Sequence, residues 1–143
     1  MRWIKHIVVH STGTDTEKKA RNFFKDQTPI YHFVIERDGE IVTTCGEHRI
    51  VESFKKEDFT SIHIAYIGGI DKDGKPINNM SKLQQEALFF KLAELSSHYY
   101  NAAIIGADEM DIQANSPGFN MKQWLNGYEP NYCLDKETFS MAA

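Results

Sequence analysis

The order of strand-like and helix-like segments constrains the fold of this chain more than any other feature. Strand signals, rich in β-branched and aromatic residues, lie at residues 3–9, 30–36, 40–44, 61–67 and 102–105. Helix signals lie at residues 14–24, 81–99 and 120–125. The turn signal Asp38-Gly39 joins the second and third strands as a hairpin. Together these segments predict an α/β (α+β) fold, with a central mixed sheet flanked by helices.

Two regions between the strands differ in how well their structure can be predicted. Ser81-Lys82-Leu83-Gln84 has the form of a capping box, and leucines then follow at helical spacing, at Leu88, Leu92 and Leu95. The pattern Thr14-Asp15-Thr16-Glu17 has the same form and predicts the start of the first helix. Residues 46–60 are polar and irregular, so we expect a long loop there.

Length and charge limit the classes of function. The chain has 143 residues, 41% of them hydrophobic, which is typical of one globular domain spanning residues 1–143. Sixteen basic and 20 acidic residues give 16 − 20 = −4, so nucleic acid and anionic membranes are not expected as partners. The sequence lacks an apolar run of the roughly 20 residues that span a membrane, and it does not start as a signal peptide does. We therefore expect a cytoplasmic protein.

The two cysteines do not form a metal-binding pair. Cys45 and Cys133 lie 88 positions apart, unlike the CxxC pairs of zinc and redox sites. A cytosolic chain keeps such thiols reduced, so free thiols are the expectation and a disulfide is the alternative.

His10 is the first candidate for a functional residue, because it ends an apolar strand and precedes small polar residues. A catalytic zinc needs three protein ligands and an open position for water, whose pKa the metal lowers. His6 lies on the same strand face but four residues away, or roughly 13 Å at about 3.3 Å per residue. His6 is therefore excluded as a second ligand, and a hydrogen-bonded histidine at a strand end is the alternative for His10.

Several segments resemble, in order, the zinc-dependent N-acetylmuramoyl-L-alanine amidases of the phage-lysozyme and peptidoglycan-recognition type. They are His10-Ser11-Thr12, Tyr31-His32-Phe33 with Arg37-Asp38-Gly39, Ser61-Ile62-His63-Ile64, Ile67-Gly68-Gly69 with Asp73-Gly74-Lys75, and Ser116-Pro117-Gly118-Phe119 with Trp124. The similarity covers about residues 4–125 and leaves residues 126–143 as a C-terminal extension. The Gly-Gly-Ile-Asp loop is shared most closely with phage and prophage forms, which implies a bacterial or prophage origin and a cell-wall substrate.

The resemblance implies a groove for peptidoglycan, with zinc held by two histidines and a cysteine. Carried over one position at a time, the first histidine is His10, while Ala107 and Ser116 replace the other two ligands. The family tyrosine that assists hydrolysis corresponds to Tyr31, and a groove histidine corresponds to Phe54. The basic residue two positions before the cysteine is replaced by Ala114. Alanine has no donor atom, and a serine hydroxyl is a far weaker zinc ligand than a thiolate.

These replacements leave three functional hypotheses open. The first is a pseudoenzyme without a cofactor, which keeps the fold and binds peptidoglycan or muropeptide without hydrolysing it. The second is an active amidase whose zinc site has been rebuilt from His10, His63 and Asp108. The third is a module that binds a protein partner on the amidase scaffold. Whether the chain is an enzyme therefore depends on whether a metal site survives.

Overall fold

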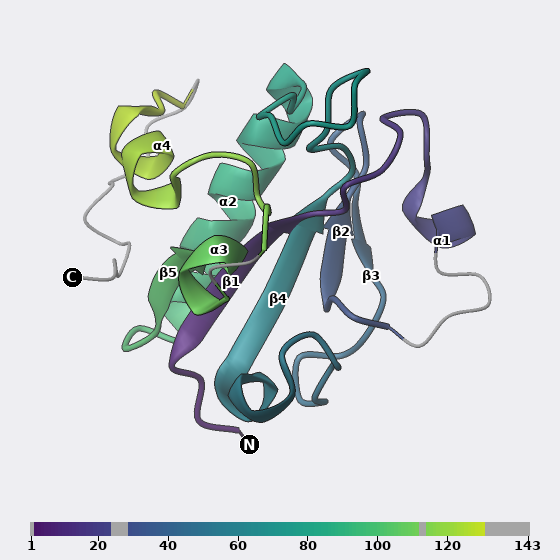
Figure 1. The fold of residues 1–143 in the computed structure, drawn as a ribbon. Helices are drawn as coiled ribbons and strands as arrows, with labels where there is room; N and C mark the ends of the chain where they lie inside the picture. The colour runs from purple at the N-terminus through teal and green to yellow at the C-terminus, as the bar shows by residue number, and fades with distance from the viewer. Residues whose placement is uncertain (1, 24–28, 112–113, 131–143) are drawn as a thin grey trace.

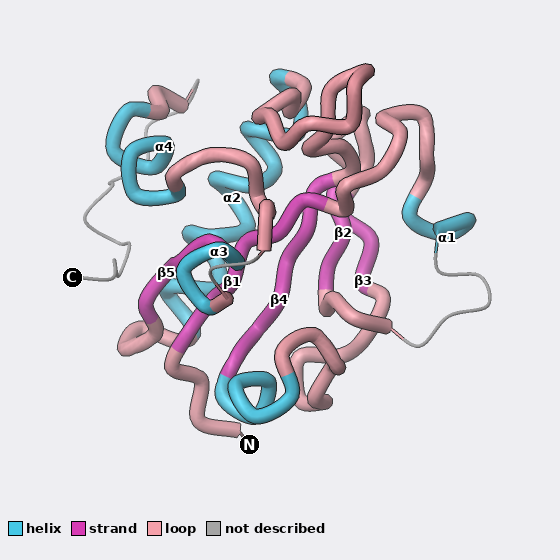
Figure 2. The backbone as a smooth tube through the Cα atoms, in the orientation of Figure 1, coloured by secondary structure: helices cyan, strands magenta, loops and turns pink. Residues whose placement is uncertain are grey.

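A computed structural model describes residues 2–23, 29–111 and 114–130, and it contains the predicted mixed sheet with helices packed against it (Figure 1). Five strands, drawn in magenta in Figure 2, lie in the order β3-β2-β4-β1-β5. Their bounds are β1 His6–Ser11, β2 Phe33–Ile35, β3 Ile41–Thr43, β4 Ser61–Tyr66 and β5 Ala103–Gly106. β4 pairs in parallel with β1 and β2, β5 pairs in parallel with β1, and β3 is antiparallel to β2. The predicted fold class is confirmed.

The helices are short except for one. Their bounds are α1 Ala20–Phe23, the 3-10 helix η1 Lys55–Thr60, α2 Lys82–His98, α3 Ala107–Met110 and α4 Met121–Gly127. The predicted capping box starts α2: the Ser81 hydroxyl accepts from the Gln84 amide, and the Gln84 side chain accepts from the Ser81 amide. Within the described residues, the structure has no helix long and apolar enough to cross a membrane.

Side chains alternate between the two faces of the sheet, and the faces differ in chemistry. On one side, which we call the helix face, strand residues pack against α2, which lies behind the sheet in Figure 1. Its buried members include Ile7, Val9, Ile62, Ile64, Leu88, Phe89, Leu92 and Leu95. Burying each such side chain contributes about 1.5–3 kcal/mol, so this face supplies most of the apolar stabilisation.

The opposite side, which we call the histidine face, carries Val8, His10, His63 and Ala65 on the two central strands. Val8 pairs with His63 and His10 pairs with Ala65, so the two histidines lie diagonally across neighbouring strands. All four side chains are buried. α3 and η1 lie on the viewer's side of the sheet in Figure 1.

Two local predictions were wrong. The pattern Thr14-Asp15-Thr16-Glu17 does not cap a helix, since α1 begins at Ala20 and the Asp15 carboxylate instead accepts the Glu17 amide in a turn. Residues 46–60 are not wholly irregular, because they include η1. Local patterns of this kind suit both turns and helix starts, and tertiary contacts choose between them.

The loop that follows β4 needs a glycine where it meets the end of β1. Gly69 has a φ of +97°, and a Cβ there would lie 2.2 Å from the Cβ of Ser11. Its amide donates to the side chain of Asn79. This close approach brings the loop against the last residue of β1.

Some predictions concern residues outside the described ranges. They are Phe24, the last residue of the first predicted helix, and residues 131–143 of the C-terminal extension, which include Cys133. Cys45 is half-buried.

Candidate functional site

A pocket of about 340 Å³ opens where β1 and β5 end on the histidine face. It is lined by His10, Ser11, Ile30, Tyr31, Glu52, Ser53, Phe54, Ala107, Ala114 and Ser116. The structure therefore brings together all five positions that the sequence assigned to the groove: His10, Tyr31, Phe54, Ala107 and Ser116. A larger hollow of about 590 Å³ lies beside Ile50 and Phe59, but none of these five residues lines it. The carboxyl ends of parallel strands meet at one edge of a sheet, which is why residues about 100 positions apart converge.

His10 lies among aromatic rings. Its ring centroid is 4.9 Å from that of Tyr31 and 5.5 Å from that of Phe54, whose plane is tilted by only 17°. Burial lowers the pKa of His10 well below its usual range, and His63 lowers it further, while Asp58 opposes the shift. The His10 imidazole is therefore neutral at pH 7 and carries one ring proton.

His63 links His10 to a buried carboxylate. Nδ1 of His63 lies 2.9 Å from Nε2 of His10, and Nε2 of His63 lies 2.9 Å from Oδ1 of Asp58. The second contact has the distance of an ion pair, although its orientation falls outside strict hydrogen-bond geometry. The side chains of His63 and Asp58 are 0% and 1% exposed. A line of polar groups thus crosses the histidine face from η1 to the pocket.

Asp58 is held by backbone amides as well as by His63. Its Oδ2 accepts from the amides of Ser53 and Phe54, and its Oδ1 accepts from the amide of Phe54. Burial by itself raises the pKa of Asp58, but the contact with His63 and the hydrogen bonds from these amides outweigh burial and leave the pKa below its usual value. Asp58 is therefore ionised at pH 7 and acts as an acceptor only.

The sequence did not single out Asp58. It lies in a segment predicted to be a loop, and nothing in its neighbours marks it as buried. The available signal was His63, a polar residue within an otherwise apolar strand. Such a residue needs a buried partner, because an unsatisfied polar group costs free energy.

Tyr31 contributes a phenol to the pocket wall. It is 7% exposed, and burial raises its pKa to about 12. The phenol therefore keeps its proton at neutral pH and can donate a hydrogen bond to a ligand carbonyl.

The other two positions that the sequence predicts to correspond to metal ligands offer little to a metal. Ala107 is 1% exposed and has no donor atom in its side chain. The Ser116 hydroxyl accepts a 2.6 Å hydrogen bond from the amide of Ser11 and lies 3.4 Å from the Ser11 carbonyl. Its oxygen is thereby committed to the backbone of β1.

Asp108 lies next to Ala107 on α3, but it does not line the pocket. Its amide donates to the carbonyl of Ser116. A shared metal would need ligand atoms close to one another. In the described part of the chain, the ligand atoms of His10, His63 and Asp108 do not all lie within 4.8 Å of one another. The structure thus joins His10 to His63 and leaves Asp108 apart.

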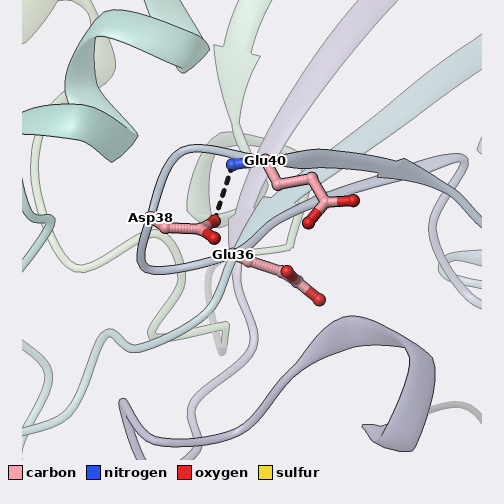
Figure 3. Close-up of side chains that lie close together, drawn as sticks. All are labelled: Glu36, Asp38 and Glu40. Carbon is pink, nitrogen blue, oxygen red and sulfur yellow. Dashed lines mark hydrogen bonds between the residues drawn. The ribbon is translucent and has the colours of Figure 1, made fainter.

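Three carboxylates on the hairpin between β2 and β3 do have ligand atoms within 4.8 Å of one another. Figure 3 shows Glu36, Asp38 and Glu40, with Asp38 accepting the amide of Glu40. Glu36 accepts the amide of Ala20, and Glu40 faces Arg21 at 3.5 Å. These contacts tie the hairpin to α1, and none of the three carboxylates lines the pocket.

His32 has a structural role beneath the pocket. Its Nε2 donates to the carbonyl of Arg49, and its Nδ1 accepts from the amide of His63. Burial, the largest influence, lowers its pKa to about 4. A neutral His32 therefore joins the loop after β3 to the middle of β4.

Known proteins share this fold and part of this sequence. A family model described as N-acetylmuramoyl-L-alanine amidase matches residues 1–119. The endolysin of Enterobacteria phage K11 is 30% identical over 125 residues, covering 82% of each chain. The solved structure of the Ph2119 endolysin, from Thermus scotoductus MAT2119 bacteriophage Ph2119, has a TM-score of 0.69 at 19% identity and covers 86% of this chain and 82% of that one. The solved structure of tracheal cytotoxin bound to the ectodomain complex of peptidoglycan recognition proteins LCa and LCx has a TM-score of 0.67 at 20% identity. The match covers 87% of this chain and 82% of that one.

Proposed function

The chain belongs to the N-acetylmuramoyl-L-alanine amidase family, and from this premise we propose that it binds peptidoglycan fragments around His10 without hydrolysing them. The supporting observation is a pocket lined by Tyr31 and Phe54 in which, of the three positions predicted to correspond to metal ligands, only His10 has the side chain of a usual zinc ligand. Tyr31 and Phe54 provide aromatic surface, and the Tyr31 phenol provides a hydrogen-bond donor. A muropeptide presents amides, hydroxyls and a sugar ring, which suit such walls.

A catalytic zinc does not fit the residues present. Nε2 of His10 faces His63, the Ser116 hydroxyl is bonded to the Ser11 amide, and Ala107 has no donor. Catalytic zinc sites have three protein ligands, and here one ring nitrogen of His10 is left. Hydrolysis in this family depends on the metal for both the activated water and the polarised carbonyl, so we infer that this chain does not cleave the amide bond.

Ligand binding has a parallel in the fold. The peptidoglycan recognition proteins LCa and LCx, whose structure resembles this one, were solved with tracheal cytotoxin bound. At 20% identity the likeness concerns the fold, so it supports a binding function by analogy. The pocket residues of this chain supply the physical argument.

Two measurements on tag-free protein test the proposal. The first is elemental analysis after equilibration with zinc and extensive dialysis, with His10→Ala as control. We expect substantially less than one zinc per chain, with no difference between the two proteins. The second is calorimetric titration with muramyl dipeptide, in which we expect saturable binding that Tyr31→Ala or His10→Ala weakens.

The contrary outcomes point to the other two hypotheses. Stoichiometric zinc that disappears in His10→Ala would mean a rebuilt metal site, and release of L-alanine peptides from peptidoglycan would then establish an active amidase. Absence of both zinc and muropeptide binding would overturn the proposal and favour a surface for a protein partner.

A further inference from the structure

Three buried side chains connect the 3-10 helix to the pocket. Asp58 on η1 contacts His63 in the middle of β4, and His63 contacts His10 near the end of β1. Each contact measures 2.9 Å. The two contacts use the two ring nitrogens of His63. In a neutral ring, the nitrogen that carries the proton donates a hydrogen bond and the other nitrogen accepts one.

The position of each proton follows from the carboxylate end. Asp58 already accepts from two backbone amides and has only acceptor atoms when ionised, so the Nε2 of His63 that faces it must carry a proton. If His63 holds only that one proton, its Nδ1 is bare and accepts the Nε2–H of His10. A neutral His10 carries no second proton, so its Nδ1 is bare as well.

The bare nitrogen of His10 is open to the pocket. Nε2 makes the hydrogen bond to His63, while Nδ1 has no hydrogen-bond partner among the described residues. The His10 side chain lines the pocket. Among the described residues, Nδ1 of His10 is not a fully buried atom that lacks a partner. An accessible acceptor on a pocket wall is a recognition element for a ligand N–H or O–H.

We propose that Asp58, acting through His63, holds His10 in the tautomer that presents a bare Nδ1 to the pocket, where it accepts a hydrogen bond from an amide N–H or hydroxyl of the ligand. The identity of the ligand as a muropeptide rests on the proposed function. Asp58 and His63 are positioning residues, and His10 is the residue that touches the ligand. In this arrangement His63 fixes the His10 ring through Nε2 and leaves Nδ1 facing the pocket.

Asp58→Asn should reverse the tautomers. The backbone amides of Ser53 and Phe54 require an oxygen at the Oδ2 position, so the amide nitrogen of the new side chain would face His63. That nitrogen donates, which leaves Nε2 of His63 bare and places its proton on Nδ1. Nε2 of His10 then accepts, and its Nδ1 carries the proton. The pocket would offer a donor in place of an acceptor.

Two-bond ¹H–¹⁵N correlation spectra of the full-length protein distinguish these tautomers without any ligand. At pH 7.5 we expect Nε2–H on both His10 and His63 in the wild type, and Nδ1–H on both in Asp58→Asn. Glu57→Gln removes a carboxylate from the same 3-10 helix, at an exposed position, and should leave both tautomers unchanged. Wild-type protein with Nδ1–H on His10 would overturn the inference, even if Asp58→Asn fails to fold.

Titration with muramyl dipeptide tests the ligand half. We expect affinity about tenfold lower in Asp58→Asn, since one hydrogen bond is replaced by two opposed donors, and no change in Glu57→Gln. Unchanged affinity in a folded Asp58→Asn with reversed tautomers would overturn the role of Nδ1 in binding. Wild-type protein that shows the expected tautomers but no binding would instead overturn the proposed function and leave the positioning by Asp58 standing.

Discussion

The two faces of the sheet are built from the same strands, yet they carry different chemistry. The helix face is apolar, with Ile7, Val9, Ile62 and Ile64 packed against α2. The histidine face buries His10 and His63 together with Asp58. Buried polar groups are stable only when they are paired, and here each has a partner. One face can therefore hold the fold while the other changes its chemistry, provided that the buried polar groups keep their partners.

The largest expected effect comes from adding metal donors to the histidine face. Ala107→His combined with Ser116→Cys adds two zinc ligands beside the open Nδ1 of His10. We expect about one zinc per chain to survive dialysis, because binding to three such ligands is worth roughly 10 kcal/mol. Elemental analysis measures this, with each single variant as control. A double variant that holds no more zinc than the wild type would show that the backbone has changed as well as the donors.

On the helix face, Leu92→Ala should be the most damaging change to stability. Leu92 is fully buried in the core beneath α2, so its truncation leaves a cavity and lowers the free energy of unfolding by about 2–5 kcal/mol. Urea unfolding checks the loss. At a temperature where the variant is folded, its affinity for muramyl dipeptide should match the wild type. Weaker binding by the folded variant would show that the two faces are coupled.

Acid should act on the histidine face. The folded-state pKa of His32 is lowered to about 4, so as the pH falls the unfolded chain takes up the proton first, near its usual pKa of about 6.5. Stability is therefore full above about pH 6.5 and falls towards about pH 4, by on the order of 3 kcal/mol. The lowered pKa of His10 acts in the same direction.

Urea unfolding at a series of pH values measures this slope. His32→Gln, which can still donate to the Arg49 carbonyl, should flatten it, whereas replacing the exposed His98 by Gln should not. A slope that persists in His32→Gln would assign the acid sensitivity to His10 and its neighbours.

The smallest expected effect is at the pocket wall. Tyr31→Phe removes the phenol and keeps the ring against His10. Loss of one hydrogen bond to the ligand corresponds to about 1 kcal/mol, or roughly fivefold weaker binding of muramyl dipeptide. Calorimetry gives the affinity, and Tyr100→Phe, at an exposed position, is the matched control. Equal affinities for all three proteins would exclude the phenol from ligand binding.

Much of the fold could be predicted, because its signals are local. The capping box at Ser81 and the leucines of α2 lie within one helix, and the β-branched residues of each strand predict that strand. The predictions failed where a short polar pattern suited more than one structure, as in the turn at Asp15 and the 3-10 helix that carries Asp58. Such segments are decided by contacts with distant parts of the chain.

For the candidate site, the sequence by itself determined which side chains stand at the positions that the resemblance assigns to metal ligands. Two of those positions are Ala107 and Ser116, and no fold can give an alanine side chain a donor atom. Only the tertiary structure decided what His10 does instead. Its link through His63 to Asp58 depends on strand register, on the burial of η1 and on distances of 2.9 Å. Hydrogen bonds need atoms within about 3 Å in a suitable orientation, and His10 and His63, which are 53 positions apart along the chain, meet this condition only once the sheet is formed.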